Sequence, residues 1–250
     1  MGTLLWLGFI AGVVPVFLGL GVAVWLGRIL PRTWESAFVG VAVGVLLYLF
    51  FDLMHESVEF SSARDPLSWL VLLGGLGVSL VGMVALETGT VFGGHATPRT
   101  LSLPYMIAIG MGLHNLGEGL AIGASYATGD ASLSLLLVLG FALHNGTEGF
   151  GIVAASGKNS VTLTEIVWLG LIAGAPTCLG ALLSGQGLSS YWTILFYTFA
   201  AGSLLYVALS LTAMSYTVTR RLQMSAGVFG GIALMYITAM LLELLGGVKS

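Results

Sequence analysis

Long apolar segments follow one another along this chain and restrict it to one class of fold. Each is about 20 residues or longer, which as an α-helix crosses the ~30 Å hydrocarbon core of a bilayer. With 57% hydrophobic and only 8% charged residues, the 250-residue chain is far more apolar than a soluble core requires. The predicted spans are Thr3–Leu26, Trp34–Val58, Leu67–Leu86, Leu103–Ala127, Ala131–Ala155, Leu163–Ser184, Tyr191–Tyr216 and Met224–Leu245. We therefore expect an all-α integral membrane protein with eight transmembrane helices, which form one domain over residues 1–250. We expect this multi-pass protein to lie in the cell (inner or plasma) membrane.

The basic residues predict how these spans are oriented. Lysine and arginine concentrate in cytoplasmic loops. Only two of the eight basic residues, Arg64 and Lys249, fall outside the odd-numbered loops, which hold Arg28, Arg32, Arg99, Lys158, Arg220 and Arg221. The odd loops are therefore predicted to be cytoplasmic, with both termini extracellular or periplasmic. The single cysteine, Cys178, excludes an internal disulfide and a cysteine-based metal cluster.

Weak internal repeats relate the two ends of the chain. They pair the first span with the sixth, the second with the seventh and the third with the eighth. The matching stretches are Gly8–Gly12 before Pro15 with Gly170–Gly174 before Pro176, Gly44–Tyr48 with Gly202–Tyr206, and Gly74-Gly75 with Gly230-Gly231. Because each pair joins an odd span to an even one, the halves run in opposite directions. This predicts a 3+2+3 inverted repeat, an arrangement typical of secondary transporters with midplane binding sites.

The two central spans carry the same polar motif, H-N-x-x-E-G. Its chemically active residues are His114, Asn115, Glu118, His144, Asn145 and Glu148. A carboxylate at the centre of a membrane helix costs roughly 2.5–3.5 kcal/mol on insertion scales and usually marks an ion or substrate path. Positions i and i+4 share a helix face, so we expect His114 over Glu118 and His144 over Glu148.

The connection between these two spans is only three residues long, so they are predicted to be antiparallel neighbours whose motifs meet. Imidazole, amide and carboxylate groups together suit zinc, iron, manganese or cadmium. Glycines crowd both motifs, among them Gly117, Gly119, Gly146 and Gly149. Glycine weakens a helix, and broken helices here would free backbone carbonyls to face an ion.

Paired H-N-x-x-E-G motifs on the fourth and fifth of eight spans resemble the ZIP family of divalent metal transporters, in its short prokaryotic branch. The resemblance implies uptake of zinc or a related cation through a binuclear site, with the six motif residues as ligands and the glutamates as bridges. It also implies a transport bundle of spans 1, 4, 5 and 6, a scaffold of spans 2, 3, 7 and 8, elevator-type motion and a homodimer. The stretch from Asp52 to Glu56 is similar to an acidic stretch of the family, so Asp52, His55 and Glu56 are candidates for the ion entrance.

Two other classes remain open. The His and Glu residues could form a relay in a proton- or solute-coupled transporter. An intramembrane metalloenzyme would typically carry H-E-x-x-H, which neither motif matches, so we expect no enzyme activity. We expect metal ions and lipid as partners, no organic cofactor and no nucleic acid.

Overall fold

A computed structural model describes residues 1–29, 31, 34–88, 102–129, 131–156, 161–184 and 189–246, and within them the regular elements are all helices. The first span consists of α1 (Gly2–Gly8), a π-helical segment η1 (Phe9–Val13) and α2 (Val14–Ile29). The others are α3 (Glu35–Glu59), α4 (Pro66–Glu87), α5 (Leu103–Ala127), α6 (Ala131–Ala155), α7 (Leu163–Ser184), α8 (Ser190–Ser215) and α9 (Arg221–Gly246), with a short 3₁₀ turn η3 (Val218–Arg220) before α9.

Most of these helices are apolar enough to cross a membrane, as the long apolar segments predicted. In the described part of the chain, seven meet the requirement of length and composition: Gly2–Ile29, Glu35–Glu59, Pro66–Glu87, Leu133–Val153, Leu163–Ser184, Ser190–Ser215 and Val218–Leu241. At 25 residues α5 is also long enough, but it carries the polar side chains of the first motif. The chain therefore has the helices of a multi-pass membrane protein.

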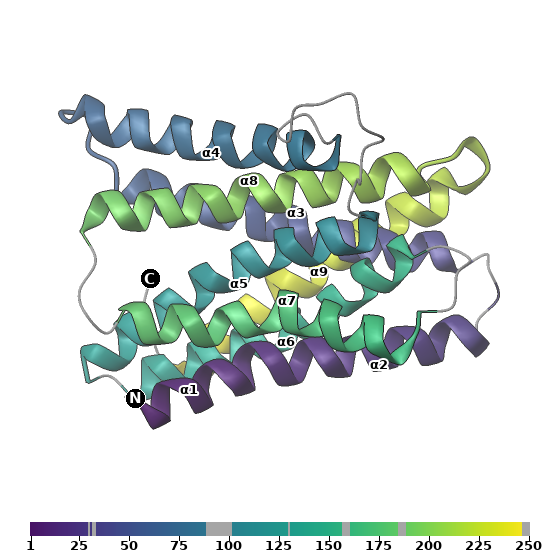
Figure 1. Cartoon of the computed structure of the whole chain (residues 1–250), viewed down its shortest axis with the longest axis horizontal. Helices are drawn as coiled ribbons and strands as arrows, with labels where there is room; N and C mark the ends of the chain where they lie inside the picture. The colour runs from purple at the N-terminus through teal and green to yellow at the C-terminus, as the bar shows by residue number, and fades with distance from the viewer. Residues whose placement is uncertain are drawn as a thin grey trace.

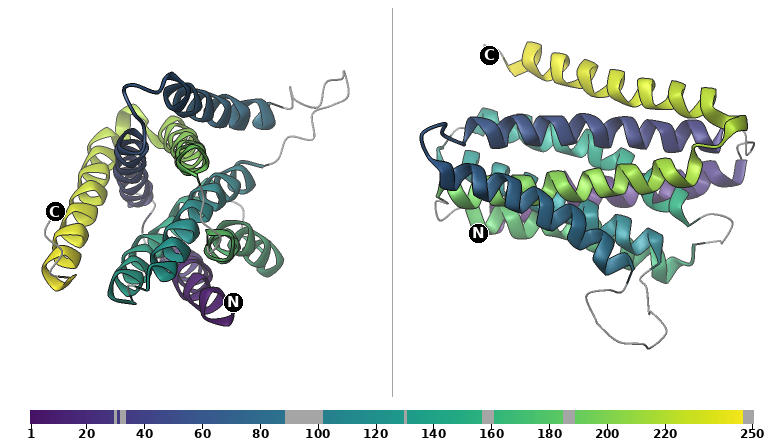
Figure 2. Two further views of the ribbon diagram at one scale, coloured as in Figure 1. Left: turned by 90° about the vertical axis from the view of Figure 1, so that its left-hand side faces the viewer. Right: turned by 90° about the horizontal axis from the view of Figure 1, so that it is seen from above.

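Consecutive spans run in opposite directions, and the helices pack in a defined pattern (Figures 1 and 2). The helix α5 contacts α6 and α7, and α2 contacts α6; elsewhere α3 contacts α8 and α9, and α4 contacts α8. Figure 1 places the N-terminus and the end of α9 at the same end of the bundle. Arg28 near the end of α2 and Arg221 at the start of α9 lie at the opposite end of the bundle from Arg64, which stands between α3 and α4. Arg32, Arg99, Lys158 and Lys249 lie outside the described residues, and the membrane side of each end stays a prediction.

Glycines let the helices that carry the motifs approach closely. A Cβ atom at Gly19 on α2 would lie 2.0 Å from the carbonyl oxygen of Gly146 on α6, and one at Gly119 on α5 would lie 2.1 Å from that of Thr177 on α7. Gly129, in the turn between α5 and α6, has a φ of 79°, which glycine adopts without strain. Small residues thus allow each motif helix to pack almost backbone to backbone against a helix of the first or sixth span.

Neither motif helix breaks at its glycines. Both α5 and α6 run unbroken through their motifs, because tight packing against neighbouring helices compensates for the weak helix propensity of glycine. The irregular backbone lies instead in the first span, at η1, where the chain forms a turn of π-helix.

Candidate metal site

The two motifs meet in the interior of the bundle. His114, Asn115 and Glu118 come from the middle of α5, and the second motif comes from α6; all six side chains are at most 6% exposed. The structure therefore brings together the whole predicted set of His114, Asn115, Glu118, His144, Asn145 and Glu148. Buried polar groups in this number are expensive unless they are paired with one another or with a ligand.

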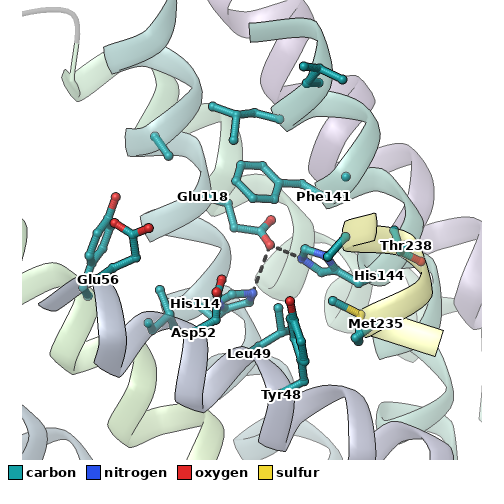
Figure 3. Close-up of a pocket in the computed structure, with 18 residues that line it drawn as sticks. Tyr48, Leu49, Asp52, Glu56, His114, Glu118, Phe141, His144, Met235 and Thr238 are labelled. Atoms are coloured by element: carbon teal, nitrogen blue, oxygen red, sulfur yellow. Dashed lines mark hydrogen bonds and ion pairs between the residues drawn. The ribbon is translucent and has the colours of Figure 1, made fainter. Parts of the chain in front are cut away.

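Glu118 lies at the centre of this group. Its Oε1 is 3.0 Å from Nε2 of His114 and also contacts Nε2 of His144, while its Oε2 accepts a hydrogen bond of 2.7 Å from Nδ2 of Asn145. Figure 3 shows both imidazoles pointing toward this one carboxylate. One ligand atom from each of His114, Glu118 and His144 lies within 4.8 Å of the others, as a shared metal ion would require.

The pairing within the second motif differs from the prediction. His144 contacts Glu118 on the facing helix instead of Glu148 one turn along its own helix. Glu148 accepts a hydrogen bond of 3.2 Å from Nδ2 of Asn115, and its other oxygen is 3.9 Å from Nε2 of His114. The i, i+4 rule describes one helix, whereas the stagger of two antiparallel helices decides which side chains meet across them.

Each asparagine also donates to a backbone carbonyl of a third helical segment. Nδ2 of Asn145 bonds to the carbonyl oxygen of Ala11 in η1 at 2.9 Å, and Nδ2 of Asn115 bonds to that of Ala173 in α7 at 3.0 Å. Sequence reasoning missed both carbonyls, although Ala11 and Ala173 occupy the same position in the repeated Gly-x-x-Ala-Gly stretches. The backbone carbonyls at the site therefore accept from side-chain amides.

Several buried polar atoms at the site have no hydrogen-bond partner among the described residues. Three are acceptor oxygens, namely Oδ1 of Asn115, Oδ1 of Asn145 and Oε1 of Glu148, and the others are the two ring nitrogens of His114, whose Nε2 lies near Glu118 without forming a hydrogen bond to it. An unpaired buried acceptor costs roughly 1–3 kcal/mol. A divalent cation would satisfy several of them at once and would offset the charge of the two carboxylates, so the residues present fit a metal ion.

A cavity of about 290 Å³ leads to this cluster (Figure 3). Its lining includes His114, Glu118 and His144, and also Asp52 and Glu56 from the C-terminal part of α3. Leu136 and Phe141 line it from the first half of α6, so the cavity extends from the motifs toward the end of the bundle that holds both termini. Two of the three predicted entrance residues thus lie on the approach to the site.

The third, His55, does not line this cavity. Its Nε2 is 3.3 Å from Oε1 of Glu59, one turn along α3, and both side chains are more than 60% exposed. His55 instead lines, together with Asp52 and Tyr236, a neighbouring cavity of about 460 Å³ between α3 and α9. Sequence reasoning also missed Tyr48, Phe141 and Met235 as lining residues, since helices that are apolar all round carry no periodic signal for the inner face.

The opposite end of the site is closed by apolar side chains. Met111 lies one turn before His114, and Ile152 lies one turn after Glu148; both are fully buried and pack in the same cluster as Leu211. Beyond this layer, a second cavity of about 310 Å³ is lined by residues that include Tyr105, Ser156 and Glu165. The cluster is therefore open toward one end of the bundle and sealed from the other.

The sequence matches no family model and no curated protein. The geometry of the site itself therefore carries the functional argument.

Proposed function

We propose that this protein is a membrane transporter that moves divalent metal cations toward the cytoplasm through the site between α5 and α6. The observation that carries the proposal is the buried group of His114, Glu118 and His144, whose ligand atoms lie within 4.8 Å of one another. Intramembrane ionisable residues mark ion paths, and this group ends a cavity whose other carboxylates, Asp52 and Glu56, would attract cations.

The donors favour a transition-type metal. Imidazole and carboxylate ligands together suit zinc, iron, manganese and cadmium, and the resemblance to the ZIP family makes zinc the leading candidate. Asn115, Asn145 and Glu148 would complete the coordination of one ion or hold a second beside it. The paired motifs, with their resemblance to the ZIP family, support the same class of cargo.

An inverted repeat is the second part of the proposal, and the helix contacts support it. Exchanging the second span with the seventh and the third with the eighth converts the packing of α3 on α9 into that of α8 on α4, and both contacts occur. Exchanging the first span with the sixth and the fourth with the fifth likewise converts the packing of α5 on α7 into that of α6 on the first span, and this contact also occurs. The hydrogen bonds of the two asparagines to Ala11 and Ala173 follow this relation as well.

Transport would proceed by alternating access. The first span with α5, α6 and α7 would carry the ion and move against a scaffold of α3, α4, α8 and α9, in an elevator-type motion within a homodimer. One end state of such a cycle requires a site that is accessible from one side of the membrane and closed toward the other. The cavity at one end of the site and the apolar layer at the other, formed by Met111, Ile152 and Leu211, fit this requirement. With the odd loops in the cytoplasm, this state would be open to the outside.

Flux into proteoliposomes tests the proposal. Vesicles containing a metal-sensitive dye are exposed to zinc, cadmium, manganese or ferrous iron, and the wild type is compared with Glu118→Gln and His144→Ala. Both variants should lose most of the flux, because each removes a ligand at the centre of the site. Glu59→Gln, which changes an exposed carboxylate beside His55, is the matched control and should transport normally.

Two results would contradict the proposal. Folded wild-type protein that moves none of the four metals is not a transporter of this class, and the relay or metalloenzyme hypotheses would then be reopened. Full flux through Glu118→Gln would show that the ion takes a path that avoids the site.

A further inference from the structure

The first span and the sixth differ at the point where they meet the asparagines of the site. Pro15 is the fourth residue after Ala11, whereas Pro176 is only the third residue after Ala173. The extra residue of the first span coincides with η1, where the backbone N–H of Val14 bonds to the carbonyl of Phe9, five residues back. A π-helical turn of this kind accommodates one inserted residue within an α-helix.

Pro15 removes the donor that an α-helix would offer to the carbonyl of Ala11. In an α-helix, the N–H of residue 15 would bond to the carbonyl of residue 11, but proline has no N–H. The change of register at η1 leaves a further carbonyl without a donor in the same turn. Ala11 is fully buried, so water cannot supply the donor, and Nδ2 of Asn145 does so at 2.9 Å.

The sixth span reaches a similar contact by another route. Thr177, four residues after Ala173, has a backbone N–H, whereas Pro176 withdraws a donor from the carbonyl of Ile172. The amide of Asn115 donates hydrogen bonds of 3.0 Å to Ala173 and 3.2 Å to Glu148. The amide of Asn145 donates hydrogen bonds of 2.9 Å to Ala11 and 2.7 Å to Glu118. The shorter pair of hydrogen bonds is made by Asn145, which faces Ala11, the residue whose carbonyl loses its α-helical donor to Pro15.

We propose that Pro15 is a positioning residue for the metal site and acts through Asn145. Because Pro15 has no N–H, the carbonyl of Ala11 accepts one N–H of the Asn145 amide. The other N–H of that amide bonds to Glu118, so the orientation of the whole amide is fixed. The amide oxygen Oδ1, buried and without a partner among the described residues, is then available only to a cation. The inference rests on the proposed metal site and adds a residue that touches no ion.

The test compares two proline substitutions. Pro15→Ala supplies the N–H that an α-helix directs to the carbonyl of Ala11, so this carbonyl no longer depends on Asn145 in place of its α-helical donor. Pro176→Ala makes the same chemical change in the sixth span, but its new N–H is directed to Ile172, to which neither asparagine donates. Zinc affinity, measured by calorimetry on purified protein, should fall about tenfold or more in Pro15→Ala, the range seen for partners of metal ligands. It should stay within about twofold of wild type in Pro176→Ala.

A double-mutant cycle separates positioning from a general effect on the helix. If Pro15 acts through Asn145, then Pro15→Ala in an Asn145→Ala background should lower zinc affinity by no more than about twofold further. A helix that merely packs badly would lose affinity equally in both backgrounds. Equal losses in the two backgrounds, or equal losses in the two proline variants, would overturn the proposal.

A second readout needs no metal. The chain has three asparagines, so selective ¹⁵N-asparagine labelling gives a simple spectrum of side-chain amides. The Asn145 amide protons should exchange slowly in the wild type and faster in Pro15→Ala, with no change in Pro176→Ala. Unchanged exchange in Pro15→Ala refutes the positioning. Absence of zinc binding in the wild type, with the exchange difference present, refutes the metal site instead, so the two failures are distinguishable.

Discussion

Gly19→Ala should disrupt the site by forcing two helices apart. The added Cβ would lie 2.0 Å from the carbonyl oxygen of Gly146 and 2.9 Å from its carbonyl carbon, whereas real Cβ contacts essentially never fall below 3.0 Å. Both obstacles are backbone atoms, so a rotamer change cannot relieve the clash. The helices α2 and α6 must therefore separate by about 1 Å, which at the usual cost of overpacking lowers the free energy of unfolding by roughly 1–3 kcal/mol.

The displacement acts directly on the metal site, because Gly146 follows Asn145, which bonds to Ala11 beside the same interface. Thermal unfolding in detergent and zinc calorimetry measure the two effects. Gly21→Ala is the matched control on the same helix: no heavy atom lies within 4 Å of its added Cβ, and alanine favours the helix by up to about 1 kcal/mol. Equal melting temperatures and equal zinc affinities in the two variants would refute the close-approach argument.

Two further predictions concern the ion and its route. Zinc affinity should weaken as the solution is acidified, because metal ligands must be free of protons to bind and metal binding therefore releases protons; an affinity independent of pH by calorimetry would contradict a site built from imidazoles and a carboxylate. Combined Asp52→Asn and Glu56→Gln should raise the half-saturating zinc concentration for flux while leaving the maximal rate unchanged, most clearly at low ionic strength, because these carboxylates concentrate cations at the cavity. His55→Ala should have no such effect, and an equal effect would contradict the placement of His55 on the outer face of α3.

The helices could be predicted from the sequence more fully than their contacts. The bounds of α5, α6 and α7 coincide with the predicted spans, because charged or turn-forming residues end each apolar run. The meeting of the two motifs also followed from the short connection between α5 and α6. Contacts between helices depend on rotation and stagger, which uniformly apolar helices do not encode in a periodic pattern. For that reason the pairing of His144 with Glu118 and the outward direction of His55 could not be foreseen.

Backbone features were harder still to predict. The π-helical turn at Phe9–Val13 and the carbonyl of Ala11 have no side-chain signature of their own. Their one trace in the sequence is the spacing between alanine and proline, which is four residues in the first span and three in the sixth. That difference gains meaning only when the two spans are compared with each other.

The polar character of α5 has a consequence for how the protein enters its membrane. A carboxylate at mid-helix opposes insertion by the translocon, and α5 is the long helix that does not meet the apolar requirement among the described residues. Among the described residues that pair with Glu118 by hydrogen bond or ion pair, His114 lies on the same helix, whereas His144 and Asn145 belong to α6. We therefore expect stable membrane insertion of α5 to depend on α6, with the two helices entering the bilayer as one hairpin that turns at Gly129. A nascent chain released just after Ala127 would leave α5 without those partners and expose it to membrane quality control.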